Sequence, residues 1–276
     1  MSTVTVSASA RELRVTARSV AKGKRKGQRL AMLTAYDFGF ARIFDAAGID
    51  LILVGDSLAN VVQGEDTTLP VTLDEIVYHT RLVARAAKRA MVVADMPFGS
   101  YQVSPEDAVR SAVRLVKEGG AQAVKLEGGA GMRTTIERIV GAQVPVMGHV
   151  GLTPQSIHQM GGFRVQGRGE AGRHRVIDDA RSVEQAGAFA CVLEGIPAEL
   201  AAEITDRLSI PTIGIGAGPD CDGQVLVMHD MLGLNDWTPN FVKQYANIGA
   251  LTAQAARAFA DEVRNGKFPD EETSYR

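Results

Sequence analysis

Cysteine, excess charge of one sign and long apolar runs are all scarce or missing in this chain of 276 residues. The two cysteines, Cys191 and Cys221, lack metal-ligand spacing, and Cys191 lies inside an apolar run, as a small buried hydrophobe would. A formal net charge of -2 gives no electrostatic case for binding nucleic acid or an anionic membrane. No apolar stretch approaches the roughly 20 residues of a membrane span. The first ten residues lack the charged start and apolar core of a signal peptide, so we expect a cytoplasmic protein.

What the chain does have is an alternation of short apolar runs with helical segments. With 45% hydrophobic and 22% charged residues, its composition is that of one enzyme-sized globular domain. A capping box from Thr72 to Glu75 opens one helix, and Ser104 followed by Pro105 opens another. The predicted strands are residues 29–35, 50–55, 90–95, 122–127, 144–149, 188–194, 210–215 and 223–229.

Strands that alternate with helices in this way favour the α/β class and a single (β/α)8 TIM barrel. A doubly wound open sheet is the competing fold. However, residues 34–40, which follow the first strand, carry neither a dinucleotide fingerprint nor a phosphate loop. We predict an N-terminal lead-in over residues 1–28, partly disordered or helical, with disorder in residues 1–10. Residues 29–276 then form the barrel catalytic domain with a C-terminal helix.

Polar, chemically useful side chains stand at or near the ends of the apolar runs. In a parallel barrel the carboxyl ends of all strands meet on one face, and that face carries the chemistry. Residues far apart in the sequence are therefore expected to share one pocket. They are Asp56, Ser57, Asp95, Lys125, Glu127, His149 and Glu194.

Three of these acids suggest a site for a divalent cation. Asp56, Asp95 and Glu127 follow successive strands and would leave a buried negative charge even after Lys125 is counted. Such a charge is costly unless the acids take up protons or a cation binds, and Mg²⁺ prefers oxygen ligands. The competing interpretation is that a strand-end aspartate only caps the next helix.

The remaining side chains suggest proton transfer. Lys125 and Glu127 are two residues apart and should point to the same side of a strand, as a catalytic pair or as a structural ion pair. Glu194 ends a very apolar run, so it is expected to be partly desolvated and to act as a base, unless it only caps the following helix. His149 could orient substrate, move a proton or cap a loop. A cation, a lysine and a separate carboxylate base together suit the enolisation of an α-keto acid.

Three glycine-rich or basic segments each allow two functional interpretations. Residues 161–175 contain five glycines and four arginines, which is typical of a mobile loop over an active site or of an assembly loop. The glycines of residues 214–218 could bind phosphate or narrow the barrel rim. The basic run of residues 22–26 is expected to be a solvated lead-in rather than a phosphate patch.

Nine stretches of the chain resemble one family across residues 28 to 270. These stretches are MLTAYD (32–37), LVGDSL (53–58), ADMPFGSY (94–101), AVKLEGG (123–129), GHVGLTPQS (148–156), GGFRVQGR (161–168), VLEGIP (192–197), IPTIGIGAG (210–218) and CDGQVLVMHDMLG (221–233). They resemble ketopantoate hydroxymethyltransferase, a (β/α)8 barrel family of the phosphoenolpyruvate/pyruvate class. That family moves a hydroxymethyl group from 5,10-methylenetetrahydrofolate to 3-methyl-2-oxobutanoate and gives 2-dehydropantoate for pantothenate and coenzyme A synthesis.

The resemblance also implies roles for residues, cofactors and partners. It implies that Mg²⁺ binds Asp56 and Asp95, with Glu127 as a third metal-site acid. It implies that the keto acid contacts Asp56, Ser57, Asp95 and Lys125. Glu194 would accept the proton and His149 would support the site. The implied partners are the keto acid and a reduced folate, with no nucleic acid or membrane, and the implied assembly is a homodecamer. Asn240 departs from the family pattern, where lysine is common.

Two rival functions differ in class from this one. The first is another Mg²⁺-dependent barrel enzyme, a carbon–carbon lyase acting on a related α-keto acid. Such lyases commonly carry a catalytic cysteine loop that this chain does not have. The second is a non-catalytic barrel that serves in assembly or binding, which would have no use for the strand-end acids and lysine.

Overall fold

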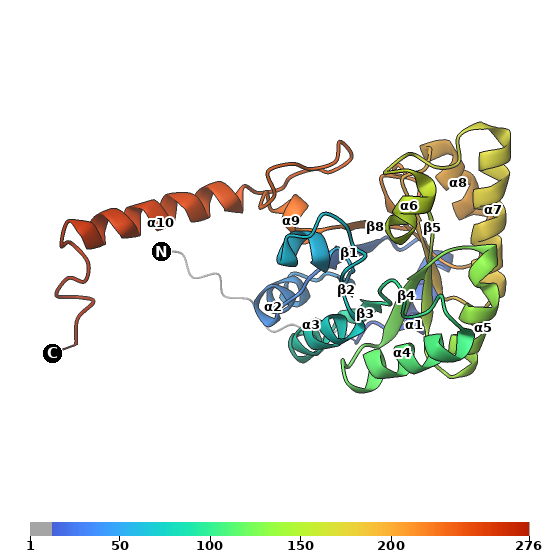
Figure 1. The fold of residues 1–276 in the computed structure, drawn as a ribbon, viewed down its shortest axis with the longest axis horizontal. Coiled ribbons are helices and arrows are strands. Elements are labelled where there is room, and N and C mark those ends of the chain that lie inside the picture. Colours follow the sequence, from blue (N-terminus) through green and yellow to red (C-terminus); the bar gives the residue numbers. More distant parts are fainter. Residues whose placement is uncertain (1–12, 276) are drawn as a thin grey trace. The chain divides into compact units, whose positions relative to one another are not determined.

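The computed structural model describes residues 13–275, and its central feature is a closed barrel of parallel strands (Figure 1). The strand order is β1-β2-β3-β4-β5-β6-β7-β8, so each strand pairs with its neighbour in the sequence and β8 closes onto β1. The predicted (β/α)8 barrel is therefore confirmed. The chain divides into two compact units, Met1–Leu226 and Val227–Arg276, and the whole barrel belongs to the first.

The strands match the predicted apolar runs to within a few residues. They are β1 Leu30–Thr34, β2 Leu51–Val54, β3 Met91–Asp95, β4 Ala123–Glu127, β5 Val146–Gly151, β6 Ala190–Glu194, β7 Thr212–Ile215 and β8 Gly223–Leu226. Strands β2, β3 and β4 are buried at every position, as expected for strands covered on both faces.

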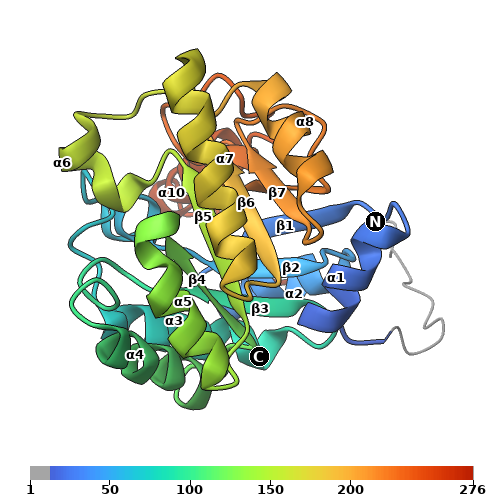
Figure 2. The ribbon, with the colours of Figure 1, turned by 90° about the vertical axis from the view of Figure 1, so that its right-hand side faces the viewer.

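Helices connect the strands and cover the outside of the barrel. The α-helices of the first unit are α1 Ala17–Arg25, α2 Phe38–Ala46, α3 Leu73–Ala86, α4 Pro105–Lys117, α5 Arg133–Gly141, α6 Ile157–Met160, α7 Gly169–Gln185 and α8 Ala198–Arg207. Short turns are the π-helical η1 Ala59–Gln63 and the 3-10 turns η2 Ala130–Met132 and η3 Pro154–Ser156. Figure 2 shows α5 and α7 lying over the strands β4 to β6.

The predicted helix starts are present. At α3, the Thr72 side chain accepts a hydrogen bond from the backbone of Glu75, and the Glu75 carboxylate accepts one from the backbone N–H of Thr72. At α4, the Ser104 hydroxyl accepts from the backbone of Asp107, and Pro105 occupies the first helical position. These contacts satisfy backbone donors that the helix itself leaves unpaired, which fixes where each helix begins.

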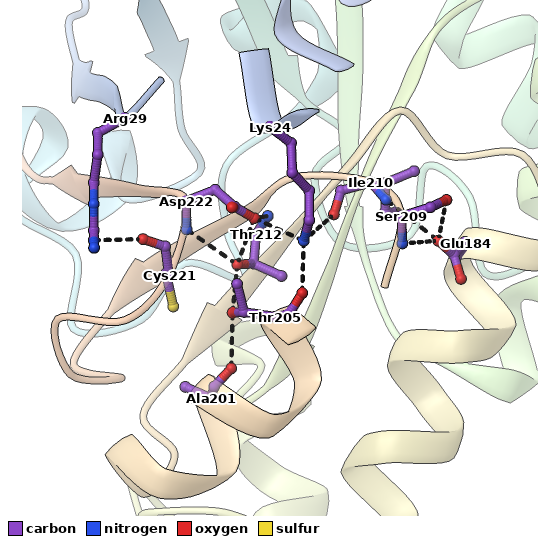
Figure 3. A network of polar contacts seen from close by, with 10 residues as sticks. All are labelled: Lys24, Arg29, Glu184, Ala201, Thr205, Ser209, Ile210, Thr212, Cys221 and Asp222. Atoms are coloured by element: carbon purple, nitrogen blue, oxygen red, sulfur yellow. Dashed lines mark hydrogen bonds and ion pairs between the residues drawn. The ribbon is translucent and has the colours of Figure 1, made fainter. Parts of the chain in front are cut away.

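The amino-terminal end of the barrel is sealed by α1. Val15 and Val20 pack with the inward-facing side chains of the strands in one buried cluster. The Lys24 ammonium donates to the backbone carbonyls of Thr205 and Ile210 at 2.6 and 3.2 Å, and it lies 3.0 Å from the Asp222 carboxylate (Figure 3). The basic run is thus partly structural, because Lys24 ties α1 to the base of the barrel opposite the strand carboxyl ends.

One prediction for the loops is wrong. Residues 161–175 do not form one long loop, because α7 begins at Gly169 and includes the second half of the segment. The helix is amphipathic and buries Val176, Ile177, Ala180 and Val183, and this apolar face outweighs the local glycine content.

The second unit contains two helices in its described residues, 227–275. They are α9 Met228–Met231 and α10 Ile248–Arg264, and α10 has no buried residue. No helix in the described part of the chain, residues 13–275, is long and apolar enough to cross a membrane. The prediction of disorder in residues 1–10 lies outside the described residues. The predicted domain boundary at residue 28 stays a prediction.

Candidate active site

The strand register brings the predicted residues together at the carboxyl end of the barrel. Asp95 pairs with Lys125 between β3 and β4, and Glu127 pairs with His149 between β4 and β5. Asp56, just beyond β2, joins this group because its backbone N–H donates to Asp95 Oδ2 at 2.9 Å. The shared end of the strands therefore forms one buried polar cluster, as the sequence predicted.

Lys125 lies at the centre of this cluster. Its ammonium forms a buried ion pair with Asp95 Oδ1 at 2.9 Å and lies 3.3 Å from His149 Nδ1. Glu127 Oε1 lies 3.5 Å from the same ring nitrogen, so Lys125 and Glu127 do point to one side of β4. The prediction that Lys125 and Glu127 point to the same side of the strand is thus confirmed.

His149 bridges the two glutamates of the cluster. Its Nδ1 faces Glu127, and its Nε2 lies 3.1 Å from Glu194 Oε2. The Glu194 side chain is 18% exposed, whereas the side chains of Glu127 and His149 are buried. Of the two glutamates, Glu194 is therefore the one nearer solvent. Its contact with the His149 imidazole orients its carboxylate.

Ser57 belongs to a neighbouring hydrogen-bonded pair. Its Oγ lies 2.8 Å from the hydroxyl of Tyr36, which follows β1. Burial raises the pKa of Tyr36 above its usual value, so this phenol stays neutral and can donate a hydrogen bond. Ser57 is thus oriented at the edge of the acid cluster by a fixed partner.

The sequence reasoning missed Gln155 and Tyr101, which connect the acids. The Gln155 side-chain amide donates to Asp56 Oδ2 at 2.9 Å and to the carbonyl of Met96 at 3.0 Å. Its backbone N–H donates to Glu127 Oε2 at 3.0 Å, and its Oε1 accepts from the Tyr101 hydroxyl at 2.7 Å. That hydroxyl in turn accepts from the backbone N–H of Glu127. Tyr101 lies in the loop after β3 and Gln155 in the 3-10 turn η3, so no strand-end pattern could reveal them.

Burial controls the acidity of the two aspartates. It raises the pKa of Asp56 to about 6, and the nearby Glu127 carboxylate adds to this rise. It also raises the pKa of Asp95 to about 6, although the Lys125 ammonium opposes the shift. Three acids share the one Lys125 ammonium, which explains why it does not fully offset the effect of burial on the pKa of either aspartate.

The pKa values of Lys125 and His149 are raised as well, but for these basic groups a raised pKa favours the charged form. Burial alone would lower the pKa of Lys125, but Asp95, Asp56 and Glu127 together raise it above its usual value. Burial and Lys125 also act to lower the pKa of His149, yet its hydrogen bonds with Glu127 and Glu194 outweigh them and raise it to about 9. At neutral pH both groups therefore carry a positive charge among the acids.

The carboxylate oxygens of the cluster are the type of ligand that a hard cation prefers, but they are not arranged as a three-ligand metal site. Within residues 13–275, no set of three or more acidic, histidine or cysteine side chains is arranged to hold a metal ion. Gln155 already occupies one oxygen of Asp56 and one of Glu127. However, Glu127 Oε1 is buried with the His149 ring as a long contact at 3.5 Å, so this oxygen keeps capacity to meet a cation or ligand.

Comparison with solved structures agrees with the class that this barrel and site define. The chain is similar to 2,3-dimethylmalate lyase, a member of the PEP mutase/isocitrate lyase superfamily, at 18% identity and a TM-score of 0.61, covering 95% of this chain and 90% of that one. It is also similar to phosphonopyruvate hydrolase at 12% identity and a TM-score of 0.62, covering 95% and 92%. The chain thus has the barrel fold of that superfamily.

Sequence relatives identify the family within the class. Residues 14–271 match the family described as ketopantoate hydroxymethyltransferase. The 3-methyl-2-oxobutanoate hydroxymethyltransferase of Pelobacter propionicus is 57% identical over 95% of this chain and 97% of its own length. The enzyme of the same name from Moorella thermoacetica is 57% identical over 97% and 100%. The chain belongs to the ketopantoate hydroxymethyltransferase family and is a transferase.

Proposed function

We propose that this enzyme transfers a hydroxymethyl group from 5,10-methylenetetrahydrofolate to 3-methyl-2-oxobutanoate and produces 2-dehydropantoate for pantothenate and coenzyme A synthesis. The observation that carries the proposal is the buried cluster of Asp56, Asp95, Glu127 and Lys125 beside the His149-oriented Glu194. The relatives' names specify the keto acid. The folate and the cation rest on the family resemblance and on the chemistry of these side chains.

The reaction balances with one water molecule. The keto acid loses its C3 proton, and C3 forms a carbon–carbon bond to the one-carbon unit. Both carbon–nitrogen bonds that hold this unit on the folate break. Water supplies the hydroxyl group, and its remaining proton and the C3 proton end on the two folate nitrogens. No oxidant or reductant is needed.

The keto acid would bind against Asp56, Ser57, Asp95 and Lys125. The Lys125 ammonium can meet the negative charge of the substrate, which increases on its keto oxygen when the C3 proton leaves. A buried ammonium stabilises such charge strongly because few water molecules compete with it. The Tyr36–Ser57 pair presents a hydroxyl group with a fixed orientation at the same edge.

Mg²⁺ would be held by Asp56 and Asp95 with Glu127 nearby. When bound, such an ion supplies Lewis-acid polarisation of the keto group. The residual negative charge of the cluster, and the buried Glu127 Oε1 with its long 3.5 Å contact to His149, favour a cation at this place. Asp56 and Asp95 must be ionised to act as ligands, so binding should weaken as pH falls through about 6.

Glu194 is the proton acceptor in this proposal. It is the more exposed member of the His149-bridged pair, at 18%, so a substrate proton can reach it. His149 holds the Glu194 carboxylate in one orientation from its far side, which is a supporting role. A positioned carboxylate of this kind usually accelerates proton transfer by roughly 10²–10⁴-fold.

The remaining assignments concern the setting of the enzyme. We propose that it works in the cytoplasm, contacts neither nucleic acid nor membrane, and assembles as a homodecamer. These proposals rest on composition and on the family resemblance.

A product assay tests the proposed function. The protein is incubated with 3-methyl-2-oxobutanoate, 5,10-methylenetetrahydrofolate and Mg²⁺, and 2-dehydropantoate is measured by mass spectrometry. We expect product only when keto acid and folate are both present, and its loss when EDTA removes the cation. Absence of product from the complete mixture would reject the proposed reaction, and undiminished product in EDTA would reject the cation.

A further inference from the structure

A pocket of about 450 Å3 opens beside the acid cluster on the carboxyl-end face of the barrel. Its walls come from the end of β4 and from the segments that follow β2, β3, β4 and β5. Glu127, Tyr101 and Gln155 line it and also belong to the cluster described above. The pocket and the cluster are therefore neighbours that share a wall.

The outer part of the pocket is apolar and aromatic. Phe98, from the loop after β3, lines it with 51% of its surface exposed, and Met132 lines it from the loop after β4. A half-exposed phenylalanine beside a buried polar network offers a ring face on which a planar ligand can stack.

The loop that carries Phe98 is held in place by hydrogen bonds. Gln102 Oε1 accepts from the backbone N–H of Gly99 at 2.8 Å, and Gln102 Nε2 donates to Gln155 Oε1 at 3.3 Å. The Ser100 hydroxyl donates to the carbonyl of Pro97 at 2.7 Å. The aromatic side chain thus stands on a braced loop, which reduces the entropy lost when a ligand stacks on it.

The size of the pocket favours a ligand larger than the keto acid. Sites for drug-sized ligands have volumes of roughly 300–1,000 Å3, and 450 Å3 lies within that range. A five-carbon keto acid would leave most of this space empty. A flat heteroaromatic ring with hydrogen-bonding edges would use the aromatic wall and also the side-chain amides of Gln102 and Gln159, which line the same pocket.

We propose that this pocket is the subsite for the pterin ring of the one-carbon donor, with Phe98 as the stacking platform. The inference rests on the proposed function, because the donor is assigned there. It goes further by placing the ring on the Glu127–Gln155 side of the acid cluster. The one-carbon unit would then approach the reacting keto acid across the shared wall, while Glu194 acts from the opposite side of His149.

The test compares Phe98→Ala with Phe98→Tyr, which keeps a ring, and with Tyr78→Ala. Tyr78 is a matched control because its side chain is equally exposed, at 51%, but lies on α3 and does not line the pocket. The first measurement is the affinity for 5-formyltetrahydrofolate, a stable folate, by isothermal titration. The second is the KM for 5,10-methylenetetrahydrofolate in the product assay. The third is the rate of C3 proton exchange of the keto acid in D₂O, which needs no folate.

Alanine substitution of a stacking aromatic typically costs about 1–3 kcal/mol per base, or roughly five- to 150-fold in affinity. We expect Phe98→Ala to lose affinity and raise the donor KM within this range. The fold-change that Phe98→Ala causes in folate affinity and donor KM should be at least about fivefold larger than the fold-change it causes in the rate of C3 exchange. Phe98→Tyr should restore most of the loss, and Tyr78→Ala should match the wild type.

Two results would overturn the inference. One is equal folate affinity and donor KM in wild type and Phe98→Ala, and the other is a parallel loss of exchange and transfer. If Phe98→Ala misfolds, Met132→Ala probes the opposite wall by the same three measurements, and no change in its donor steps would also overturn the inference. Failure of the proposed function is distinct, because then the wild type itself would neither exchange C3 protons nor form product.

Discussion

Replacing Asp56 by asparagine should make the protein more stable above pH 6, and by an amount that depends on pH. Burial holds the pKa of Asp56 at about 6 in the folded state, against 3.8 for the ordinary side chain. The folded state therefore binds a proton more tightly than the unfolded state, and stability falls as pH rises through the window from about 4 to 6. Asparagine removes the charge and keeps an oxygen that can accept the hydrogen bond of Gln155.

The size of the effect follows from the shift. A difference of about two pKa units corresponds to roughly 3 kcal/mol of free energy of unfolding at pH 8, where Asp56 is ionised in both states, and to well under 1 kcal/mol at pH 4. Urea unfolding at pH 4 and pH 8, at one protein concentration with EDTA present, measures both values. Asp66→Asn is the matched control because Asp66 is exposed in a loop.

The reasoning would be refuted by a variant that is no more stable than wild type at pH 8, or by one whose gain is the same at both pH values. A further consequence separates stability from function. Mg²⁺ with keto acid should raise the unfolding midpoint of the wild type at pH 8, because a ligand that binds only the folded state stabilises it. The same addition should have little effect on Asp56→Asn.

Three other substitutions test individual contacts. Asp95→Ala should abolish cation binding and with it the cation-dependent activity. Titration with Mg²⁺ and keto acid measures the binding, and unchanged binding would place the cation elsewhere. Lys125→Met should weaken keto-acid binding and slow C3 exchange together, whereas normal kinetics would reduce Lys125 to a structural partner of Asp95. Gln155→Leu should cost about 1–3 kcal/mol in the urea assay, since it leaves Asp56 and the Met96 carbonyl without a buried donor, and it should weaken Mg²⁺ binding. Wild-type stability with wild-type Mg²⁺ affinity would contradict the bracing role of Gln155.

The sequence predicted the barrel because its signals are local and repeated. Apolar runs mark the strands, and the cap at Thr72 and the Ser104–Pro105 pair mark two helix starts. The convergence of Asp56, Asp95, Lys125 and Glu127 follows from the parallel topology alone, so it could be predicted once the barrel was recognised.

Contacts and elements outside the strands could not be predicted in this way. Gln155 reaches Asp56 across 99 positions of sequence, and nothing in its local pattern indicates that partner. The start of α7 was missed for a related reason, since Gly169 and Gly172 indicate a loop locally while the apolar face of the helix packs on the barrel. The bridge that His149 makes between two glutamates likewise depends on strand register and side-chain direction rather than on spacing.

The central claim is that this cluster removes the C3 proton of an α-keto acid with Glu194 as the base. The most direct measurement is NMR of 3-methyl-2-oxobutanoate in D₂O with protein and Mg²⁺, which follows the loss of the C3 proton signal in wild type and in Glu194→Gln. We predict rapid exchange in the wild type and a rate lower by roughly 10²–10⁴-fold in the variant, with substrate binding kept within a few-fold. Exchange at the wild-type rate in Glu194→Gln would contradict the account.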